Sequence, residues 1–479
     1  MTFPNHNESL FDGTRRRNRL TASFHFGTVL ALIKSIKHRE ERGDYTMADL
    51  VNGRLNLSKG KRMYALLMIS IASGIVFFAC IGVRNLYYNQ LIAALGLTNA
   101  EYGMLGSVNG IANLIFYLPS GFIADKVNTK TLLVISFLGL GGLTIWFGFF
   151  PSYICLLIIF FGYGIFSIFT FWSAMLKYVR LLGSEEEQGK MFGLSEGIKW
   201  GANALVGFAG LAIIGAFVDG VAGIRVLLFF IAGLYIAFAL LILFTFPGAN
   251  TATDEPVNLR RFVEVLKVPG TWLTTLIVAS AYMAFAAAVA YFGPYCADII
   301  GVSDAVASGL AITRNYVIAA VATIIGGLVA DKFASRAKVL AVYFVLGIAA
   351  TISIMITPTT LAFGIVTTCL ATAFFCATRG ISYAVMGEAG IPVSMTGVAM
   401  GIISVFAYAP ESFMYTMMGS WLDADKVSGY NSIFIWIIVW SVIGLIVSLV
   451  TAKLKLGEKN NVIGSKDGML DPKTLESIE

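Results

Sequence analysis

Three ionisable residues lie within long apolar segments, where a charge is costly and usually serves a function. They are Arg84, Arg314 and Glu411. Arg314 is 17 residues before Asp331. A helical rise of about 1.5 Å per residue puts it about 25 Å from that end of its segment, close to the middle of a bilayer. No acidic residue lies within one turn of Arg314, so this cation can either bind an anion or pair with Glu411 on another helix.

Arg84 and Glu411 each allow two interpretations. The run "NLYYNQLIAALGL" after Arg84 has neither a charge nor a strong helix breaker before Gly96. We therefore expect the helix to continue and to leave Arg84 and Tyr88 below the mouth of the protein as candidate substrate contacts. The alternative for Arg84 is an anchor at the membrane interface. Glu411 lies about 25 Å into its own helix, where it can carry a proton or pair with an arginine.

Further polar residues occur inside apolar segments or near their ends. Asn109, Asn113 and Asn203 can line a polar path or bond between helices. The asparagines that we take as candidate substrate contacts are Asn109, Asn113 and Asn315. Glu196 and Lys199 are three residues apart and can pair on one helix face. Arg379 lies near the end of its segment, where we expect a gate or a contact with lipid headgroups.

One polar device occurs twice, as "GFIADKVNTK" at 121–130 and as "GGLVADKFASRAK" at 326–338. Asp125 and Asp331 are 206 residues apart, and each ends an apolar run. The same offset pairs Gly121 with Gly327, Lys126 with Lys332, and Asn109 with Asn315. An aspartate at a helix C-terminus is unfavourable unless it caps a neighbouring helix or pairs with a cation. We therefore predict a contact that forms when this end of the protein closes; the alternative is charges that only set the topology.

The composition requires a membrane. Hydrophobic residues make up 57% of the 479 residues and charged residues 13%, whereas a soluble domain carries about 25% charged residues. Apolar runs of the roughly 20 residues that cross a bilayer as a helix occur throughout the chain. With three histidines and five cysteines without a CxxC pair, we expect no metal site, disulfide framework or cofactor. Basic loops, rather than nucleic-acid binding, explain the net charge of +6.

We expect twelve helical spans in two halves of six. They cover 63–92, 101–124, 131–150, 152–178, 191–216, 224–246, 270–297, 303–330, 338–357, 359–385, 396–420 and 430–452. The chain then divides into an N-terminal extension, a first half, a cytoplasmic linker, a second half and a tail, at 1–62, 63–246, 247–269, 270–452 and 453–479. Basic residues gather on the side of the termini, so the positive-inside rule places both ends in the cytoplasm. Met47 is a second candidate start of the chain.

The element GxxxDK, followed by a further basic residue, occurs in both halves and resembles the signature loop of the major facilitator superfamily. The resemblance covers about residues 63–455. It implies an all-α membrane protein whose twelve transmembrane helices form two six-helix pseudo-symmetric halves, with the substrate site between them. It also implies alternating access with a small-molecule substrate and a coupling ion. We expect a monomer, because two halves of six spans enclose their own pathway, and we do not expect an enzyme, because no nucleophile–base or metal-ligand cluster occurs in the sequence. The implied gating residues are Gly121, Asp125, Lys126, Lys130, Gly327, Asp331, Lys332 and Arg336. Asn128 and Ala334 stand where the family's loop has glycine.

The run "RNLYYNQLIAALGLTNAEYG" resembles the first span of the organophosphate:phosphate antiporter branch of this superfamily, which implies anion binding by Arg84. That branch has a second arginine on span seven, and this chain has none at 270–297, so Arg314 would have to substitute. The run "FWSAMLKYVRLLGSEEEQGKMFG" resembles bacterial inner-membrane members.

The expected function is transport of a small organic anion (a phosphate, sulfonate or carboxylate compound) across the inner, or plasma, membrane. A symporter or antiporter driven by a proton or counter-anion gradient is expected, because no Walker-type loop for direct ATP use occurs. The alternative is a neutral or cationic solute, as in sugar uptake or drug efflux, with Arg314 and Glu411 as a structural or proton-relay pair.

Overall fold

The structure is a computed structural model. It describes residues 50–51, 54–183, 187–246, 259–356, 360–392, 395–454 and 456–459. Within these residues, twelve helical segments are long and apolar enough to cross a membrane, which confirms the predicted number of spans. Most of the predicted N-terminal extension and tail, the candidate start at Met47 and residues 247–258 of the linker lie outside the described residues.

The first half contains six spans. A short antiparallel pair of strands, β1 (Leu50–Val51) and β2 (Arg54–Leu55), precedes them. The helices are α2 (Lys59–Ile75), η1 (Phe78–Gly82), α3 (Val83–Leu86), α4 (Tyr88–Leu95), α5 (Asn99–Lys126), α6 (Thr129–Gly148), α7 (Tyr153–Gly164), η2 (Ile165–Trp172), α8 (Ser173–Leu181), α9 (Gln188–Gly215) and α10 (Gly220–Thr245). Segments η1 and η2 are π-helical and belong to the first and the fourth span.

The second half follows a short amphipathic helix, α11 (Leu259–Lys267), which lies inside the predicted linker. Its helices are α12 (Pro269–Asp298), α13 (Asp304–Ile312), η4 (Thr313–Ile318), α14 (Ala319–Ala330), α15 (Arg336–Ile356), α16 (Leu361–Ile381), η5 (Ser382–Val385), α17 (Thr396–Tyr408), α18 (Glu411–Ala424), α19 (Lys426–Leu454) and α20 (Leu456–Lys459).

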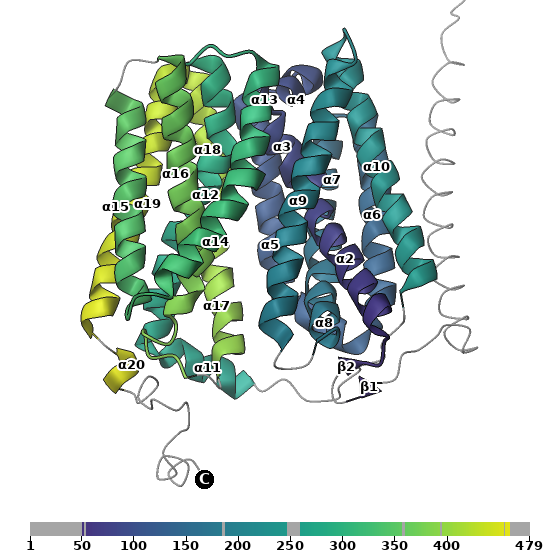
Figure 1. Cartoon of the computed structure of the whole chain (residues 1–479). Helices are drawn as coiled ribbons and strands as arrows, with labels where there is room; N and C mark the ends of the chain where they lie inside the picture. The colour runs from purple at the N-terminus through teal and green to yellow at the C-terminus, as the bar shows by residue number, and fades with distance from the viewer. Residues whose placement is uncertain are drawn as a thin grey trace, which may run out of the picture.

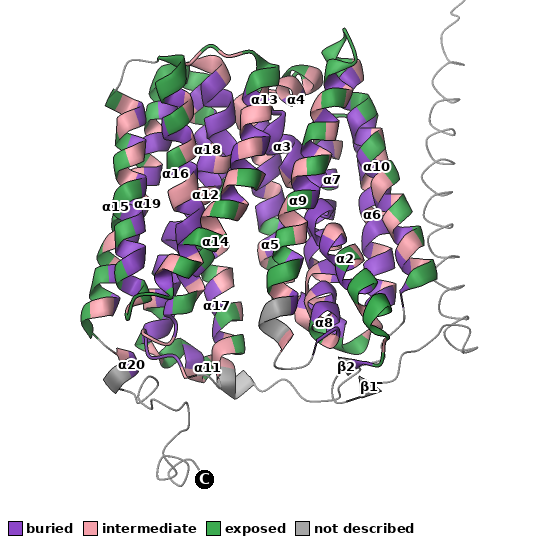
Figure 2. Cartoon of the chain, viewed as in Figure 1, coloured by how far each residue is buried: buried purple, intermediate pink, exposed green. Residues whose placement is uncertain are grey.

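The two halves stand side by side as two helical bundles (Figure 1). We call the end where α2 begins and α19 ends the terminal end, which is the lower end in Figure 1, and the opposite end the far end. The helices turn buried faces toward each other and exposed faces outward (Figure 2). Many exposed side chains are large and apolar, including Leu205, Phe244 and Ile446. Such a surface suits lipid rather than water, because the bilayer takes the place of a polar shell.

Side-chain caps fix where the helices around the repeated loop begin. Thr98 and Glu101 form a capping box at the start of α5. The amide oxygen of Asn128 accepts from the Lys130 backbone N–H at 2.9 Å and starts α6. In the second half the carboxylate of Glu388 instead accepts from the backbone N–H of Arg336 at 2.5 Å, at the start of α15. The two copies of the loop therefore start the next helix with different caps.

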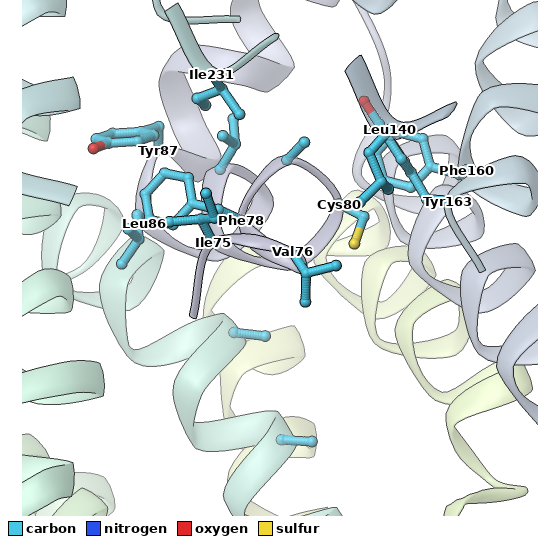
Figure 3. Close-up of a cluster of buried hydrophobic side chains, with 14 of the residues drawn as sticks. Ile75, Val76, Phe78, Cys80, Leu86, Tyr87, Leu140, Phe160, Tyr163 and Ile231 are labelled. Carbon is cyan, nitrogen blue, oxygen red and sulfur yellow. The ribbon is translucent and has the colours of Figure 1, made fainter. Parts of the chain in front are cut away.

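The first span contains a local break that a tyrosine repairs. Between α2 and η1 the regular helical hydrogen bonds are interrupted, and the hydroxyl of Tyr235 on α10 occupies the gap. It donates to the Ile75 carbonyl at 2.9 Å and accepts from the Ala79 N–H at 3.0 Å. Insertion of a side chain into the backbone ladder is a recognised cause of helix distortion. Around this point the buried side chains of α2, η1, α6, α7 and α10 form one cluster (Figure 3).

Glycines let α5 and α18 touch backbone to backbone near the far end. A Cβ atom on Gly103 would collide with the carbonyl of Tyr415, and one on Gly419 with the carbonyl of Asn99. Toward the terminal end the situation is reversed. A Cβ on Gly121 of α5, or on Gly397 of α17, would meet no atom within 4 Å. The two halves are therefore closed on each other at the far end and separated at the terminal end.

Replacing Tyr235 with phenylalanine should destabilise the first span. The change leaves the Ala79 N–H and the Ile75 carbonyl buried without their partner, which costs about 1–3 kcal/mol. We expect a lower thermal unfolding temperature for Tyr235→Phe in detergent, followed by tryptophan fluorescence. Tyr64→Phe is the matched control, because the Tyr64 hydroxyl is 3.4 Å from Thr245 at an exposed position. An unchanged unfolding temperature for Tyr235→Phe would contradict this account of the break.

Candidate functional site

A cavity of about 700 Å³ lies between the two halves. Its walls include Gly121 near the end of α5 and Gly397 in the first turn of α17, so the cavity extends to the terminal end. Aromatic rings from both halves line it, among them Trp172, Trp200 and Tyr282. A smaller recess of about 360 Å³ adjoins the cavity between α9 and α14 and shares Trp200 and Tyr282 with it.

Hydrogen bonds between the halves close the far end. The carboxylate of Asp423 on α18 accepts from the backbone N–H groups of Asn99 and Ala100 at 2.9 and 2.8 Å. These groups belong to the first turn of α5, whose N–H groups have no partner within the helix. Between α4 and α13, the side-chain amide of Asn89 donates to Asp304 at 3.0 Å.

The far-end contacts are not among the predicted gating residues, all of which lie toward the terminal end. The capping box before α5 marks the start of that helix in the sequence. Nothing in the spacing shows that Asp423, 324 residues after Asn99, supplies a further acceptor there.

Arg379 on α16 is a charged side chain in the cavity wall and, within the described residues, forms no ion pair. Its guanidinium carbon lies 4.9 Å from the ring centre of Phe285. We expected Arg379 at a gate or among lipid headgroups. It lies only six residues before the last residue of its span, Val385, but the separation of the halves opens the cavity to that depth.

Two other residues with acidic or basic side chains line the cavity, Lys199 and Glu411, and both have close partners. Lys199 forms an ion pair of 2.6 Å with Glu196, as the spacing predicts. Glu411 accepts hydrogen bonds from the hydroxyls of Tyr282 at 3.0 Å and Tyr415 at 3.1 Å. The carboxylate of Glu411 is thus held by neutral donors, and the charge of Lys199 is largely offset.

Four asparagine side chains in the cavity wall have an unpaired amide oxygen. They come from α3, α5, α9 and η4, and we call them the amide cluster: Asn85, Asn113, Asn203 and Asn315. Each is at most 9% exposed. No hydrogen-bond partner for these four oxygens occurs among the described residues. The predicted substrate contacts include Asn113 and Asn315, and Asn203 is predicted to line a polar path or to bond between helices, whereas Asn85 is not among the predicted residues.

The predicted substrate contacts therefore divide into two groups. Asn113, Asn315 and also Glu411 line the cavity. Arg84, Tyr88, Asn109 and Arg314 are buried but are not part of its wall. The side-chain amide of Asn109 donates to the Phe160 carbonyl at 3.1 Å, and its repeat-mate Asn315 donates to the Val289 carbonyl at 3.1 Å. In both halves the repeated asparagine therefore donates to the backbone of a neighbouring helix. Of the two, Asn315 also lines the cavity.

Arg84 and Arg314 lie beneath the closed far end. The Arg84 guanidinium stacks on the ring of Tyr415, with its carbon 3.8 Å from the ring centre. Arg314 is 0% exposed, and its three side-chain nitrogens have no hydrogen-bond partner in the described ranges. The guanidinium carbon of Arg314 lies 5.6 Å from the ring centre of Phe292. No ion pair between Arg314 and Glu411 is present among the described residues.

The predicted gating residues make ion pairs inside each half. Asp125 pairs with Lys177 on α8 at 3.1 Å, and Asp331 pairs with Arg336 at 3.2 Å. Gly121 lines the cavity, and a Cβ on Gly327 would meet no atom within 4 Å. The remaining members are Lys126, the last residue of α5, Lys130 in the first turn of α6, and Lys332 in the loop after α14. In this conformation each of these two ion pairs joins residues of the same half.

The polar and aromatic side chains of the site can bind a polar solute. All five cysteines are free thiols. Within the described residues no group of three His, Cys, Asp or Glu side chains could hold a metal ion. What the cavity offers is a guanidinium, amides, hydroxyls and aromatic faces between two helical bundles.

The chain is similar to a known protein family and to several known proteins. The model of the Major Facilitator Superfamily matches residues 65–413. The inner membrane protein YqcE of Escherichia coli (strain K12) is 27% identical over 406 residues, which cover 81% of this chain and 93% of YqcE. A bacterial homologue of the human lysosomal transporter Spinster, solved inward-facing and unoccupied, has a TM-score of 0.66 at 16% identity, covering 86% of this chain and 100% of that one. The nucleoside transporter NupG has a TM-score of 0.64 at 14% identity, covering 81% and 99%. The chain therefore belongs to the Major Facilitator Superfamily.

Proposed function

We propose that this chain is a secondary active transporter that moves a small organic anion by alternating access, driven by a proton or counter-anion gradient. The superfamily fold supports secondary transport of a small solute. Arg379 carries the anion proposal, because it lines the cavity without an ion-pair partner in the described part of the chain. A guanidinium binds phosphate, sulfonate and carboxylate groups with two parallel hydrogen bonds.

The conformation corresponds to a cavity open to the cytoplasm. Basic loops gather at the terminal end, which the positive-inside rule assigns to the cytoplasm together with both termini. The Spinster homologue of the same fold is inward-facing in its structure. We place the chain in the inner membrane, as YqcE is an inner membrane protein. A monomer suffices for this function, because the cavity lies between the two halves of one chain.

Arg84 and Arg314 fit a role in the opposite conformation. A charged group buried without a partner is costly, and Arg314 has no hydrogen-bond partner for its side chain among the described residues. When the far end opens, Arg84, Arg314, Tyr88 and Asn109 would come to face the widening space, and the two arginines would attract an anion there. The anion would then pass to Arg379 when the terminal end opens.

The repeated loop is proposed to close the terminal end. Asp125 and Asp331 now pair within their own halves, and the glycines at 121 and 327 have open space beside them. When the terminal end closes, these glycines permit close approach of the facing helices. Lys126, Lys130, Lys332 and Arg336 then supply cations beside the two aspartates.

Glu411 is proposed as the proton carrier. It lies in the cavity wall, where solvent from the terminal end can reach it, and two tyrosine hydroxyls hold it. A carboxyl that no cation neutralises directly can gain and lose a proton during the cycle.

A second candidate function is transport of a neutral polar solute. The amide cluster and the rings of Trp172 and Trp200 can bind an uncharged ring with hydroxyl or amine groups. NupG, which shares the fold, is a nucleoside transporter. In this case Arg379 would only shape the cavity, and its charge would not be required for binding.

Replacing Arg379 with glutamine should weaken anion binding. A hydrogen bond to a charged group contributes about 1.5–3 kcal/mol, so the Kd should rise roughly 10- to 150-fold. The measurement is the thermal stabilisation of purified protein by a panel of organic phosphates, sulfonates and carboxylates, since a ligand of the folded state raises its apparent stability.

Three variants make this test specific. Arg379→Lys keeps the charge and should retain part of the affinity, and Arg225→Gln removes a cation outside the cavity wall. Arg314→Gln should leave binding to the state shown here unchanged and slow only transport. If neutral solutes alone stabilise the protein, and Arg379→Gln responds as wild type does, the second candidate function replaces the first.

Locking the far end should stop transport. In a background without native cysteines, Ser107→Cys with Thr416→Cys places two thiols where the hydroxyls are now 2.9 Å apart, across α5 and α18. Oxidation should cross-link them and abolish uptake of the stabilising solute into proteoliposomes, and a reductant should restore it. Ser136→Cys with Thr170→Cys, whose hydroxyls are 2.6 Å apart within the first half, should cross-link without loss of uptake. Full uptake with the far end cross-linked would refute alternating access at this contact.

Replacing Glu411 with glutamine should separate driven transport from exchange. Without a carboxyl to carry the proton, uptake driven by a pH gradient should fall to the level of protein-free liposomes. Exchange of labelled for unlabelled solute at equal pH should continue, because it needs no net proton movement. Glu101→Gln changes a carboxylate at the far end outside the cavity and should keep both activities. Uptake by Glu411→Gln that still follows the pH gradient would rule out this carrier.

A further inference from the structure

The apolar side of helix α11 is covered by the protein along one edge only. Phe262 and Val265, which are three residues apart, pack in one apolar cluster with Ala399, Ile402 and Ile403 of α17. Val265 is 1% exposed. This edge fixes α11 against the second half at the terminal end, where it lies beside α17 (Figure 1).

The other edge of the apolar side is exposed. Val263 is 51% exposed and Leu266 is 37% exposed. Beside them, the exposed rings of Trp272 on α12 and Phe406 on α17 lie 5.3 Å apart, measured between ring centres. We call these four side chains the apolar strip. It begins on α11 and continues onto the outer, membrane-facing surface of two spans.

Hydrogen bonds hold α11 in a fixed corner with the next span. Val268 is the one residue between the two helices; it is extended, and Pro269 begins α12. The hydroxyl of Thr271 donates to the Val265 carbonyl at 2.8 Å, and the indole N–H of Trp272 donates to the Leu266 carbonyl at 2.9 Å. Carbonyls at the end of a helix have no partner within it, so α12 supplies the missing donors. Because α12 crosses the membrane, this corner holds α11 at the membrane surface.

The charges of α11 suit an anionic surface. Its sequence, LRRFVEVLK, contains three basic residues, Arg260, Arg261 and Lys267, and one acidic residue, Glu264. By helical register the five apolar residues fall on one side and the four charged residues on the other. A basic helix of this kind lies in the interface of a bilayer and attracts anionic lipid. The apolar strip favours lipid over a soluble partner, because it runs into the membrane-facing surface.

We propose that α11 binds anionic lipid headgroups at the terminal end and that this binding favours the open cavity. The apolar strip enters the leaflet, and the basic residues contact the headgroup phosphates. On the side of α17 that faces away from α11, Gly397 and Gly401 line the cavity. Closing the terminal end brings α17 toward α5, so α17 must either separate from α11 or pull it from the headgroups. This inference goes beyond the proposed transport and does not depend on which solute is carried.

Quenching by brominated lipid measures the contact directly. In a background without native cysteines, Val263→Cys carries a bimane label in the full chain, reconstituted into nanodiscs of phosphatidylcholine and phosphatidylglycerol. One of the two lipids is brominated at a time. Brominated phosphatidylglycerol should quench this label about twofold more strongly than brominated phosphatidylcholine. A label on Phe244→Cys, at an exposed position near the terminal end of α10, is the matched control and should show no preference.

Charge variants identify the source of the preference. Each basic residue near an anionic surface contributes about fivefold to binding. Arg260→Gln combined with Arg261→Gln and Lys267→Gln should abolish the preference of the α11 label for anionic lipid. Arg260→Lys with Arg261→Lys keeps the charges and should retain it. Lys59→Gln with Lys61→Gln removes two exposed cations from the terminal end of the first half and should have no effect.

The link to the cavity is measured by labelling Gly397→Cys with a membrane-impermeant maleimide in nanodiscs. Position 397 lines the cavity, and a Cβ there would meet no atom within 4 Å, so the thiol reports whether the terminal end is open. Labelling should be roughly threefold faster with phosphatidylglycerol than in phosphatidylcholine alone. The triple glutamine variant of α11 should lose this difference.

Each contrary outcome overturns a definite part of the inference. No quenching at position 263 overturns the membrane contact and leaves the apolar strip for a soluble partner. Equal quenching by both lipids overturns the preference for anionic lipid. A preference that leaves the labelling of Gly397→Cys unchanged overturns the link to the cavity. None of these measurements involves a transported solute, so each of these outcomes leaves the proposed transport function standing.

Discussion

The backbone contact between α5 and α18 at the far end is the constraint on which the rest of the structure depends. In a bilayer, apolar burial does not drive helices together, so close packing and polar contacts must do so. Gly103 and Gly419 allow the carbonyls of the facing helices to approach, and Asp423 adds an acceptor at the first turn of α5. Because α5 is one continuous helix from Asn99 to Lys126, contact at its far end with separation near Gly121 sets the angle between the halves. The cavity is the space that this angle leaves open.

Closing the far end has an electrostatic cost that this contact must offset. Arg314 lies fully buried with its side-chain nitrogens unpaired among the described residues, and Arg84 has the ring of Tyr415 beside it. A cation–π contact of a desolvated arginine stabilises by about 2 kcal/mol, which is less than the several kcal/mol lost when a charge leaves water. The state shown is therefore opposed by its own buried charges and favoured by the α5–α18 contact. A bound solute can shift the balance between two conformations when their free energies differ by only a few kcal/mol.

The number of spans follows from the sequence because each apolar run must satisfy its backbone within a helix in lipid. The repeated loop, with Asp125 and Asp331 at the same register, also indicates two related halves without any structure. The wall of the cavity does not follow, since it depends on the angle between the halves. Arg379 is close to a helix end in the sequence and would be expected among headgroups, yet the separation of α5 from α17 brings it into the cavity wall. Arg314 lies well inside its span, Asp304–Ala330, but the same angle leaves it outside the cavity wall. Depth along a helix is readable from residue counts, whereas the direction of a side chain between two tilted bundles is not.

Tyr415 connects the cavity to the closed far end. Its hydroxyl donates to Glu411, its ring lies under the Arg84 guanidinium, and its carbonyl both accepts from Tyr291 and lies against Gly103. Under the proposed coupling, a proton on Glu411 turns one carboxylate oxygen into a donor, so the tyrosine that bonds to this oxygen must either reverse the direction of its hydrogen bond or move. A shift of the Tyr415 ring would loosen its contact with Arg84 and raise the cost of keeping that charge buried. Because a packed interface changes between discrete arrangements rather than deforming gradually, the proposed protonation of Glu411 would then favour opening of the far end.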